Sequence, residues 1–201
     1  MRAAIRHLKA RDPVLGSLIE RMGPYRIEFR EPTFETLVRS IVFQQLSGKV
    51  ARVIYGRLAG AVPGGRMTPE GILMLRPARL RRLGLSRQKT AYIRDLARQT
   101  AKGKIVFESL SGLPDDQVIE QLTAVKGIGV WTAHMFLIFA LRRHNVLPTG
   151  DLGIRSAIKR AYGLAELPKP SEIEDLARGW QPYCTVVAWY LWRSLDGQAG
   201  I

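Results

Sequence analysis

The amino-acid sequence predicts an all-α protein. Apolar residues recur at helical spacing, and no segment alternates between apolar and polar residues as a half-buried strand would. Capping residues and prolines precede several of the periodic segments, and only a few residues separate one segment from the next. These observations predict about ten helices joined by short links.

The first half of the chain contains an amphipathic pattern followed by several shorter ones. Thr33 is the predicted N-cap of a helix over residues 34–46, and Gln45 continues the apolar face of that helix. The residues of that face are Phe34, Leu37, Val38, Ile41 and Val42. Further helices are predicted over 49–60, from Thr68-Pro69 onward, over 86–102 and over 114–122.

The second half contains the most apolar segment, residues 130–141, which is apolar on almost every side and is therefore predicted to be a buried helix. Gly163 is expected to close the helix that follows. Ser171 and Glu174 form a capping-box pattern, and Pro182 is expected to start the last helix.

The charge of the chain indicates a polyanionic partner. Lys and Arg number 31 against 17 Asp and Glu, which gives a formal net charge of +14. Such an excess on a folded chain favours nucleic acid, and the abundance of arginine favours bidentate contact with phosphate. A ribosome-associated or merely basic protein is the alternative that composition leaves open.

Several functional classes are excluded. A lone Cys184 cannot supply a disulfide, a four-cysteine zinc site or a cysteine-held iron–sulfur cluster, and it is consistent with a reducing cytoplasm. The three histidines, His7, His134 and His144, lie in unrelated surroundings. No secretory signal and no apolar run long enough to span a bilayer is visible, so no membrane partner is expected.

The stretch VKGIGVWTA places Gly127 and Gly129 directly before the buried helix. Backbone N–H groups at a glycine turn, followed by a helix N-terminus, form a potential anion site, to which Lys126 adds a charge. An ordinary helix–helix turn with an exposed lysine is the competing interpretation of this pattern.

Asp151, in LPTGDLGIR, also permits two interpretations. Aspartate is a preferred N-cap, and a periodic segment begins immediately after it. A carboxylate kept ionised by a helix dipole can also stabilise a developing sugar cation, as in glycoside-cleaving enzymes. The two roles are compatible.

The stretch LTAVKGIGVWTAHMFLIFAL, followed by LPTGDLGIR, resembles the helix–hairpin–helix DNA glycosylases, and within them the 3-methyladenine DNA glycosylase II branch. In that superfamily a Gly/Pro-rich loop and a catalytic aspartate follow the hairpin. SIVFQQLSGKVA, LGLSRQKTAYIRDLA and WQPYCTVVAWYLWR are similar to its DNA-probing turn, mid-domain helix and C-terminal helix. The similarity covers about residues 30–195.

The resemblance implies a single all-α unit over residues 1–201, with a helix–hairpin–helix motif beside a central cleft and no iron–sulfur cluster. One lobe would span roughly 30–135 and the other roughly 1–29 with 136–201. The sequence is shorter than members that carry an extra N-terminal sheet domain, so only the helical core is expected.

The resemblance also implies a base excision repair enzyme that flips out alkylated purines, of the 3-methyladenine or 7-methylguanine type, and hydrolyses the N-glycosidic bond. Asp151 corresponds to the catalytic carboxylate. Trp131 stands where glycosylase/lyases carry a Schiff-base lysine, so the expected activity is monofunctional. Trp131 is otherwise an ordinary core aromatic.

Gln45 matches the residue that fills the gap left by the flipped base. Gln44 and Leu46 are rival candidates, and a polar helix end is the simpler interpretation. The residues expected to contact DNA are Gln44, Gln45, Leu46, Ser47, Lys126, Gly127, Ile128, Gly129 and Thr132. By the resemblance, the backbone carbonyl groups of Thr123, Val125 and Ile128 would hold a monovalent cation such as Na⁺ or K⁺, and no other cofactor is expected.

The implied base pocket contains Trp131, Met135, Leu152 and Trp192. Met135 and Leu152 replace two tyrosines of the best-known bacterial member, which weakens stacking on a cationic purine and leaves the substrate range open. Trp192 is alternatively one more core aromatic, and His134 is expected to be a packed histidine rather than an acid.

The expected partner is double-stranded DNA with a damaged base, bound by a monomer in the cytoplasm, at the nucleoid. Two alternatives stay open: a non-catalytic DNA-binding protein that senses lesions, and a glycosylase for deaminated or cyclic adducts. A lyase-type enzyme for oxidised bases is disfavoured by Trp131 and by the missing cluster cysteines.

Overall fold

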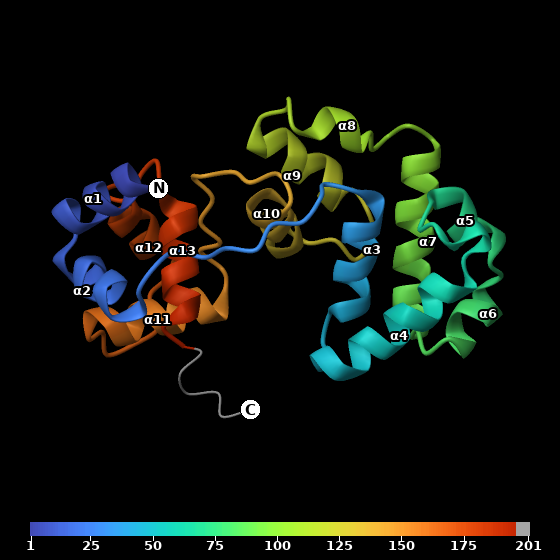
Figure 1. Cartoon of the computed structure of the whole chain (residues 1–201), viewed down its shortest axis with the longest axis horizontal. Helices are drawn as coiled ribbons and strands as arrows, with labels where there is room; N and C mark the ends of the chain where they lie inside the picture. Colours follow the sequence, from blue (N-terminus) through green and yellow to red (C-terminus); the bar gives the residue numbers. More distant parts are fainter. Residues whose placement is uncertain (196–201) are drawn as a thin grey trace. The chain divides into compact units, whose positions relative to one another are not determined.

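The computed structural model describes residues 1–195 (Figure 1). Within this range it contains thirteen α-helices, one short 3₁₀ helix (η1) and no strand, which confirms the predicted all-α class. No helix in the same range is long and apolar enough to cross a membrane. The elements are α1 (Arg2–Arg11), α2 (Pro13–Met22), α3 (Phe34–Phe43), α4 (Gly48–Ala61), η1 (Pro63–Gly65), α5 (Pro69–Met74), α6 (Pro77–Arg82), α7 (Arg87–Ala101), α8 (Phe107–Leu110), α9 (Asp115–Thr123), α10 (Val130–Phe139), α11 (Leu152–Tyr162), α12 (Pro170–Ala177) and α13 (Cys184–Arg193).

The chain forms two compact units. Unit 1 combines Met1–Phe29 with Arg142–Ile201, and unit 2 is Arg30–Leu141. The expected lobe boundary near residue 135 falls inside α10, whereas the boundary in the structure follows Leu141, so α10 belongs entirely to unit 2.

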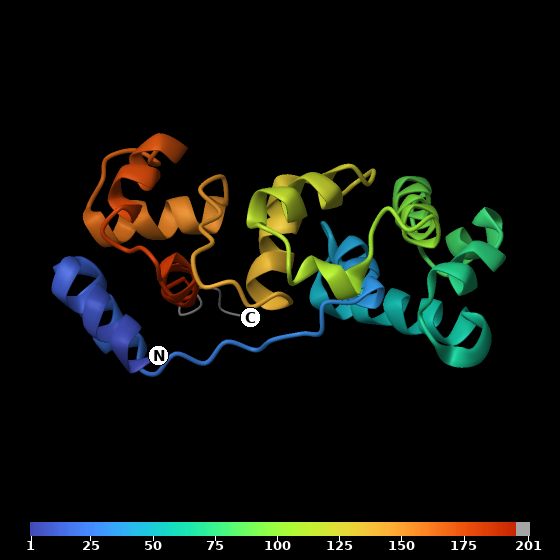
Figure 2. The same ribbon diagram turned by 90° about the horizontal axis from the view of Figure 1, so that it is seen from above.

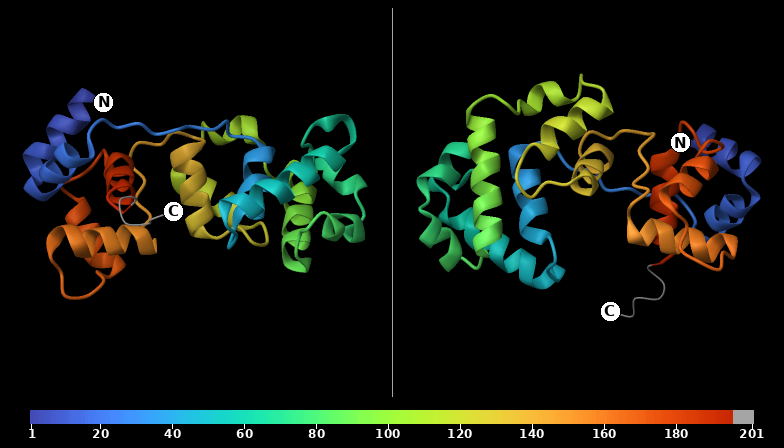
Figure 3. Two further views of the ribbon diagram at one scale, coloured as in Figure 1. Left: turned by 60° about the horizontal axis from the view of Figure 1, so that its bottom comes forward. Right: turned by 180° about the vertical axis from the view of Figure 1, so that it is seen from behind.

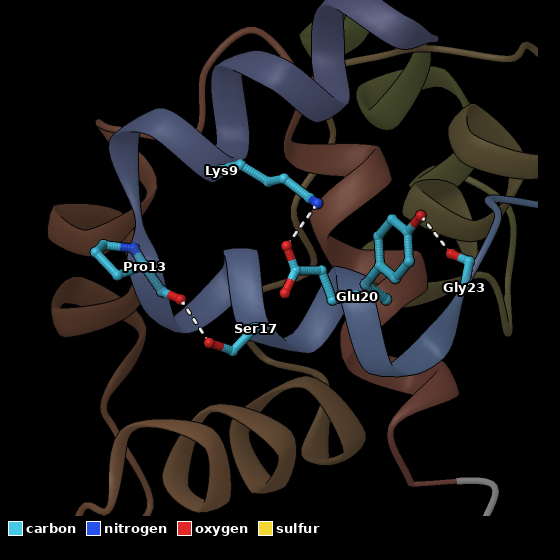
Figure 4. Close-up of polar contacts among 6 residues, drawn as sticks. Lys9, Pro13, Ser17, Glu20 and Gly23 are labelled. Atoms are coloured by element: carbon cyan, nitrogen blue, oxygen red, sulfur yellow. Dashed lines mark hydrogen bonds and ion pairs between the residues drawn. The ribbon is translucent and has the colours of Figure 1, made fainter.

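Unit 1 is built from helices at both ends of the sequence. α2 packs against α1, α11 and α13, and α11 also packs against α13. Figure 4 shows the Lys9 ammonium bonded to Glu20 between α1 and α2, and the Ser17 hydroxyl bonded to the Pro13 carbonyl. The core of unit 1 includes Leu8, Leu15, Leu18, Ile154, Ile158, Ile173, Trp180, Val187 and Leu191.

Asp12 joins the N-terminal helices to the rest of unit 1. Its Oδ1 atom accepts hydrogen bonds from the first turn of α2, at 3.0 Å from both Val14 N and Leu15 N. Its Oδ2 atom accepts from the Tyr162 hydroxyl at 2.5 Å and from Trp180 Nε1 at 2.9 Å. One carboxylate therefore caps a helix and satisfies two aromatic donors that come much later in the sequence.

Unit 2 is organised around α7, its longest helix. α3, α5 and α6 all pack against α7, and α9 packs against α10. Figure 2 shows α5 and α6 on one flank of α7, and the right-hand view of Figure 3 shows α3 running beside it. Predicted caps are confirmed here, since Thr33, Thr68 and Ser86 each accept a bond from a backbone N–H three residues later.

The predicted helix over 34–46 is too long. α3 ends at Phe43, and Gln45 has a left-handed backbone with φ 55°. Lys89 explains the early end, because its ammonium group donates to the carbonyl groups of Val42 at 2.8 Å and Gln44 at 2.6 Å. A cation on the last carbonyl groups stabilises a helix C-terminus, and partial burial lowers the pKa of Lys89.

Two predicted helix starts are wrong. α12 begins at Pro170, and the Glu172 side chain accepts from the Lys169 N–H, so the capping pattern lies two residues before the predicted Ser171. Pro182 lies outside α13, which begins at Cys184. In contrast, Gly163 closes α11 with a left-handed φ of 67°, as predicted.

Candidate active site and nucleic-acid interface

The helix–hairpin–helix motif consists of α9, the loop 124–129 and α10. Gly127 has a left-handed φ of 84°, a conformation that favours glycine. A Cβ atom added there would lie 2.0 Å from Cδ2 of the Tyr92 ring. Since Tyr92 projects from α7, only a residue without a side chain lets the loop pack against that helix.

Two further contacts fix the loop. The Lys126 backbone N–H donates to Asp95 Oδ2 at 3.0 Å, and Gln44 Nε2 donates to the Gly127 carbonyl at 3.0 Å. Gln44 is therefore part of the support of the hairpin. Gln45 and Leu46 are exposed, and they remain the candidates for the residue that fills the duplex. Ser47 is exposed as well, and its hydroxyl caps α4 by accepting from Val50 N.

The N-terminus of α10 has the features of an anion site. Gly129 is its N-cap and has no side chain, so the N-cap residue gives this end no side-chain cap. A Cβ atom at Gly129 would meet nothing within 4 Å, so another molecule has access to the backbone. N–H groups of a first turn lack partners inside the helix and carry partial positive charge. Lys126 is exposed beside them, whereas Ile128 and Thr132 are buried and help to seat the turn.

The three carbonyl groups expected to hold a cation belong to the end of α9 and the loop after it. The last carbonyl groups of a helix carry partial negative charge. The Val125 carbonyl accepts from the Ile128 N–H at 3.1 Å, and a carbonyl oxygen has a second lone pair. Neutral carbonyl oxygens are of a type that suits a monovalent cation, and the cation site at Thr123, Val125 and Ile128 stays a prediction.

α10 is less buried at its start than its composition predicts. Val130 and Trp131 are 52% and 51% exposed, so the interpretation of Trp131 as a core aromatic is wrong. The buried face begins at Thr132, and Met135 is half-buried. His134 is half-buried too, and burial lowers its pKa while Asp115 acts in the opposite direction.

Asp151 caps α11 in unit 1. Its Oδ1 atom accepts from Ile154 N at 2.8 Å, which confirms the predicted N-cap, and also from Trp192 Nε1 at 3.0 Å. The aspartate is half-exposed, and its neighbour Leu152 is 63% exposed. Two N–H donors from different helices therefore fix the carboxylate at the surface of unit 1.

Gly153 is a site residue that the sequence patterns did not reveal. A Cβ atom at Gly153 would lie 3.0 Å from Asp151 Oδ1 and 3.3 Å from Trp192 Cδ1. The missing side chain lets the half-buried Trp192 indole approach the first turn of α11. The sequence offers one signal for this role, a glycine two residues after the aspartate in GDLG.

The structure groups the candidate residues by unit. Asp151, Leu152 and Trp192 belong to unit 1, whereas Trp131, Met135 and the hairpin belong to unit 2. A base pocket that combines both groups, and the central cleft that it requires, stay predictions. Within residues 1–195, no group of three or more His, Cys, Asp or Glu side chains is arranged to hold a metal ion.

The hairpin and the aspartate that follows it lie within a segment whose sequence matches a known protein family. Residues 38–182 match the HhH-GPD superfamily of base excision DNA repair proteins. The chain belongs to this superfamily. Relatives of similar sequence include DNA-3-methyladenine glycosylase 1 of Schizosaccharomyces pombe, which is 34% identical over 194 residues, or 94% of this chain and 85% of that protein. A putative DNA-3-methyladenine glycosylase of Bacillus subtilis is 30% identical over 169 residues, or 81% of this chain and 59% of that protein.

Solved structures agree with the sequence relatives. A DNA-3-methyladenine glycosidase from Bacillus halodurans has a TM-score of 0.87 at 38% identity, covering 96% of this chain and 89% of that one. The 3-methyladenine DNA glycosylase of Schizosaccharomyces pombe, in complex with abasic DNA, has a TM-score of 0.84 at 34% identity, covering 96% of both chains. An 8-oxoguanine glycosylase/lyase from Clostridium acetobutylicum, at 18% identity and a TM-score of 0.78, shares the fold and covers 98% of this chain and 70% of that one.

Proposed function

We propose that this protein is a monofunctional DNA glycosylase that removes alkylated purines, of the 3-methyladenine and 7-methylguanine type, from duplex DNA and leaves an abasic site. The observation that carries the proposal is Asp151, a half-exposed carboxylate held by two N–H donors at the start of α11. Its place after the hairpin matches the superfamily pattern, and the relatives named 3-methyladenine glycosylases support the substrate class.

The chemistry of the substrate suits a site with one carboxylate. Alkylation at a ring nitrogen of a purine leaves the base positively charged, so the base departs without a strong general acid. As the N-glycosidic bond stretches, positive charge grows on the deoxyribose, and Asp151 stabilises that charge and positions a water molecule. Because two hydrogen bonds fix Oδ1, the carboxylate needs little reorganisation when the charge develops.

Binding to DNA is assigned to the hairpin. The backbone N–H groups around Gly129 and the first turn of α10 would contact a phosphate, with Lys126 adding charge. A monovalent cation held by the carbonyl groups of Thr123, Val125 and Ile128 would add a further positive charge beside that phosphate. Gln45 or Leu46 would fill the gap left by the flipped nucleotide.

The monofunctional assignment rests on Trp131. This residue occupies the position of the Schiff-base lysine in glycosylase/lyases, and an indole cannot form the covalent adduct. Its exposed side chain suits contact with a flipped base through stacking and cation–π attraction. Water, rather than an amine, therefore completes the reaction.

The deciding experiment compares wild-type protein with Asp151→Asn on methylated duplex DNA. Wild type is expected to release N3- or N7-alkylated purines, and Asp151→Asn is expected to lose about a hundredfold or more in rate while it retains DNA binding. Alkali-labile abasic sites, measured over time at saturating protein, give the rates. Equal rates for the two proteins would remove Asp151 from the chemistry.

Two further measurements separate the rival functions. Borohydride treatment during the reaction should trap no protein–DNA adduct, and a trapped adduct would contradict the monofunctional assignment. A panel of duplexes with single lesions tests the substrate, because Met135 and Leu152 make the expected pocket less aromatic. Release of deaminated or cyclic bases instead of alkylated purines would support the alternative glycosylase, and unchanged DNA throughout would support a lesion-sensing protein.

A further inference from the structure

Beside the hairpin, unit 2 contains an open, strongly basic pocket of about 300 Å³. It lies along α7, and α6 and the hairpin loop contribute the rest of its wall. Five basic side chains and one carboxylate, Asp95, are among the residues that line it. The basic residues are Arg81, Arg87, Arg94, Arg98 and Lys126.

Most of this positive charge is available to a ligand. Arg94 is committed to the fold, since its Nη1 atom donates to the Leu75 carbonyl at 2.7 Å. Asp95 accepts from the Lys126 backbone N–H and so belongs to the hairpin support. Among residues 1–195, no carboxylate forms an ion pair with the other four basic side chains. The pocket therefore concentrates uncompensated positive charge.

Thr90 supplies an independent sign of a ligand. It lines the same pocket, its residue is 4% exposed, and its hydroxyl oxygen has no hydrogen-bond partner within the described part of the chain. Threonine hydroxyl groups in helices usually bond to a carbonyl one turn earlier, and a buried polar group without a partner is unfavourable. A bound oxyanion would accept a hydrogen bond from this hydroxyl.

We propose that this pocket binds a backbone phosphate of the DNA, as a second phosphate site next to the one assigned to the hairpin. Arg87 and Arg98 supply charge and N–H donors, and the Thr90 hydroxyl supplies a fixed donor at the wall. Because Lys126 lies on both the pocket and the hairpin, one strand can contact the two sites in succession. This inference rests on the proposed function, since it requires duplex DNA as the substrate.

The test measures DNA affinity as a function of salt. Each phosphate contact contributes about −0.9 to the slope of log K against log salt, so Arg98→Ala should reduce the magnitude of the slope by about one and weaken binding roughly tenfold at low salt. Arg87→Ala should act in the same direction. Thr90→Val, which keeps the volume and removes the donor, should weaken binding without changing the slope. Fluorescence anisotropy with an undamaged duplex gives both quantities.

Arg6→Ala is the matched control, because Arg6 is an exposed arginine of α1 outside the pocket. If Arg98→Ala and Arg87→Ala behave like Arg6→Ala, the proposal is overturned. Titration with inorganic phosphate, followed by NMR of backbone amides in α7, tests the other source of a phosphate group. Saturable binding of free phosphate together with wild-type DNA affinity in the arginine variants would also overturn the DNA assignment.

The result is separable from the test of the glycosylase activity. Base release from methylated DNA at saturating protein reports on Asp151 and requires no particular affinity. If wild type releases no base, the proposed activity fails whatever the salt slopes are. If base release is normal and the arginine variants bind like the control, only the second phosphate site is wrong.

Discussion

At the residue scale, two aspartates of unit 1 share one arrangement. Asp12 and Asp151 each cap a helix, and each accepts a hydrogen bond from a tryptophan indole, Trp180 at 2.9 Å and Trp192 at 3.0 Å. Trp180 is 1% exposed and belongs to the core, whereas Trp192 is half-buried. The indole–carboxylate hydrogen bond thus lies against the core at Asp12, whereas at Asp151 it holds a carboxylate at the surface.

Trp192→Phe tests whether the indole N–H positions Asp151. Phenylalanine keeps an aromatic ring for packing or stacking but removes the hydrogen bond, which contributes roughly 1.5–3 kcal/mol when the acceptor is charged. We expect slower base release at saturating protein with unchanged affinity for DNA. Single-turnover rates and anisotropy measure the two effects separately.

Trp189→Phe is the control for this variant, because Trp189 is a half-buried tryptophan of the same helix that packs edge-to-face on Tyr25. A loss of rate in the control as large as that in Trp192→Phe would show that the effect comes from packing in α13. The hydrogen bond to Asp151 would then have no role in catalysis.

At the scale of elements, α7 acts as the scaffold of the candidate DNA interface. Its Lys89 ends α3, its Tyr92 packs against Gly127, and its Asp95 binds the Lys126 N–H. These side chains fix the turn before the exposed Gln45 and the turn before α10. One helix therefore positions both loops that are expected to contact DNA.

Gly127→Ala should disrupt the hairpin. The added methyl group would overlap the Tyr92 ring, and the left-handed φ of 84° is unfavourable for alanine. Each effect costs roughly 1–3 kcal/mol, so we expect a loss of about 2–6 kcal/mol in the free energy of unfolding, with loss of DNA binding. Urea denaturation and anisotropy measure the two.

Gly129→Ala provides the comparison within the same turn. Its φ of −93° is open to any residue, and the space around it is empty. Because alanine is a poorer N-cap than glycine, we expect a loss of no more than about 1 kcal/mol in the free energy of unfolding. DNA binding should weaken, because the methyl group obstructs close approach of a phosphate. Wild-type affinity in this variant would argue against phosphate contact at Gly129.

At the scale of the whole molecule, unit 1 depends on segments from opposite ends of the chain. Asp12 lies 150 residues before Tyr162 and 168 residues before Trp180, yet it accepts a hydrogen bond from each. Burial and the bond to Asp12 raise the pKa of Tyr162, so the phenol stays protonated and donates. α1 and α2 therefore contribute to the core and to the hydrogen bonds of the unit that contains Asp151.

Asp12→Asn should weaken the attachment of α1 and α2 to the rest of unit 1. An amide can still accept from the first turn of α2 through its oxygen, but its NH₂ group cannot accept from Tyr162 and Trp180. Each buried donor left without an acceptor costs roughly 1–3 kcal/mol, so the free energy of unfolding should fall by about 2 kcal/mol or more. Asp175→Asn is the control, because Asp175 is exposed and pairs with Arg178 at the surface. This substitution should change the free energy of unfolding by less than about 1 kcal/mol. Equal losses would contradict the role of Asp12.

The amino-acid sequence is sufficient to predict the features that depend on a few neighbouring residues. Thr33, Thr68, Ser86 and Asp151 cap helices through bonds to N–H groups three residues later, and Gly163 closes α11 within one turn. Such local patterns establish the all-α class. The motif around the hairpin and the aspartate after it placed the chain in its superfamily.

Features that depend on residues far apart in the sequence became visible in the three-dimensional structure alone. The first predicted helix begins at residue 34, whereas the structure contains α1 and α2 before it. α2 packs against α11 and α13, and α1 packs against α2. Lys89, far from α3 in the sequence, ends that helix before Gln45. Trp192 meets Asp151 across 41 residues, through the space left by Gly153. Periodicity cannot predict these contacts, because they are selected by the packing of separate helices and not by local propensity.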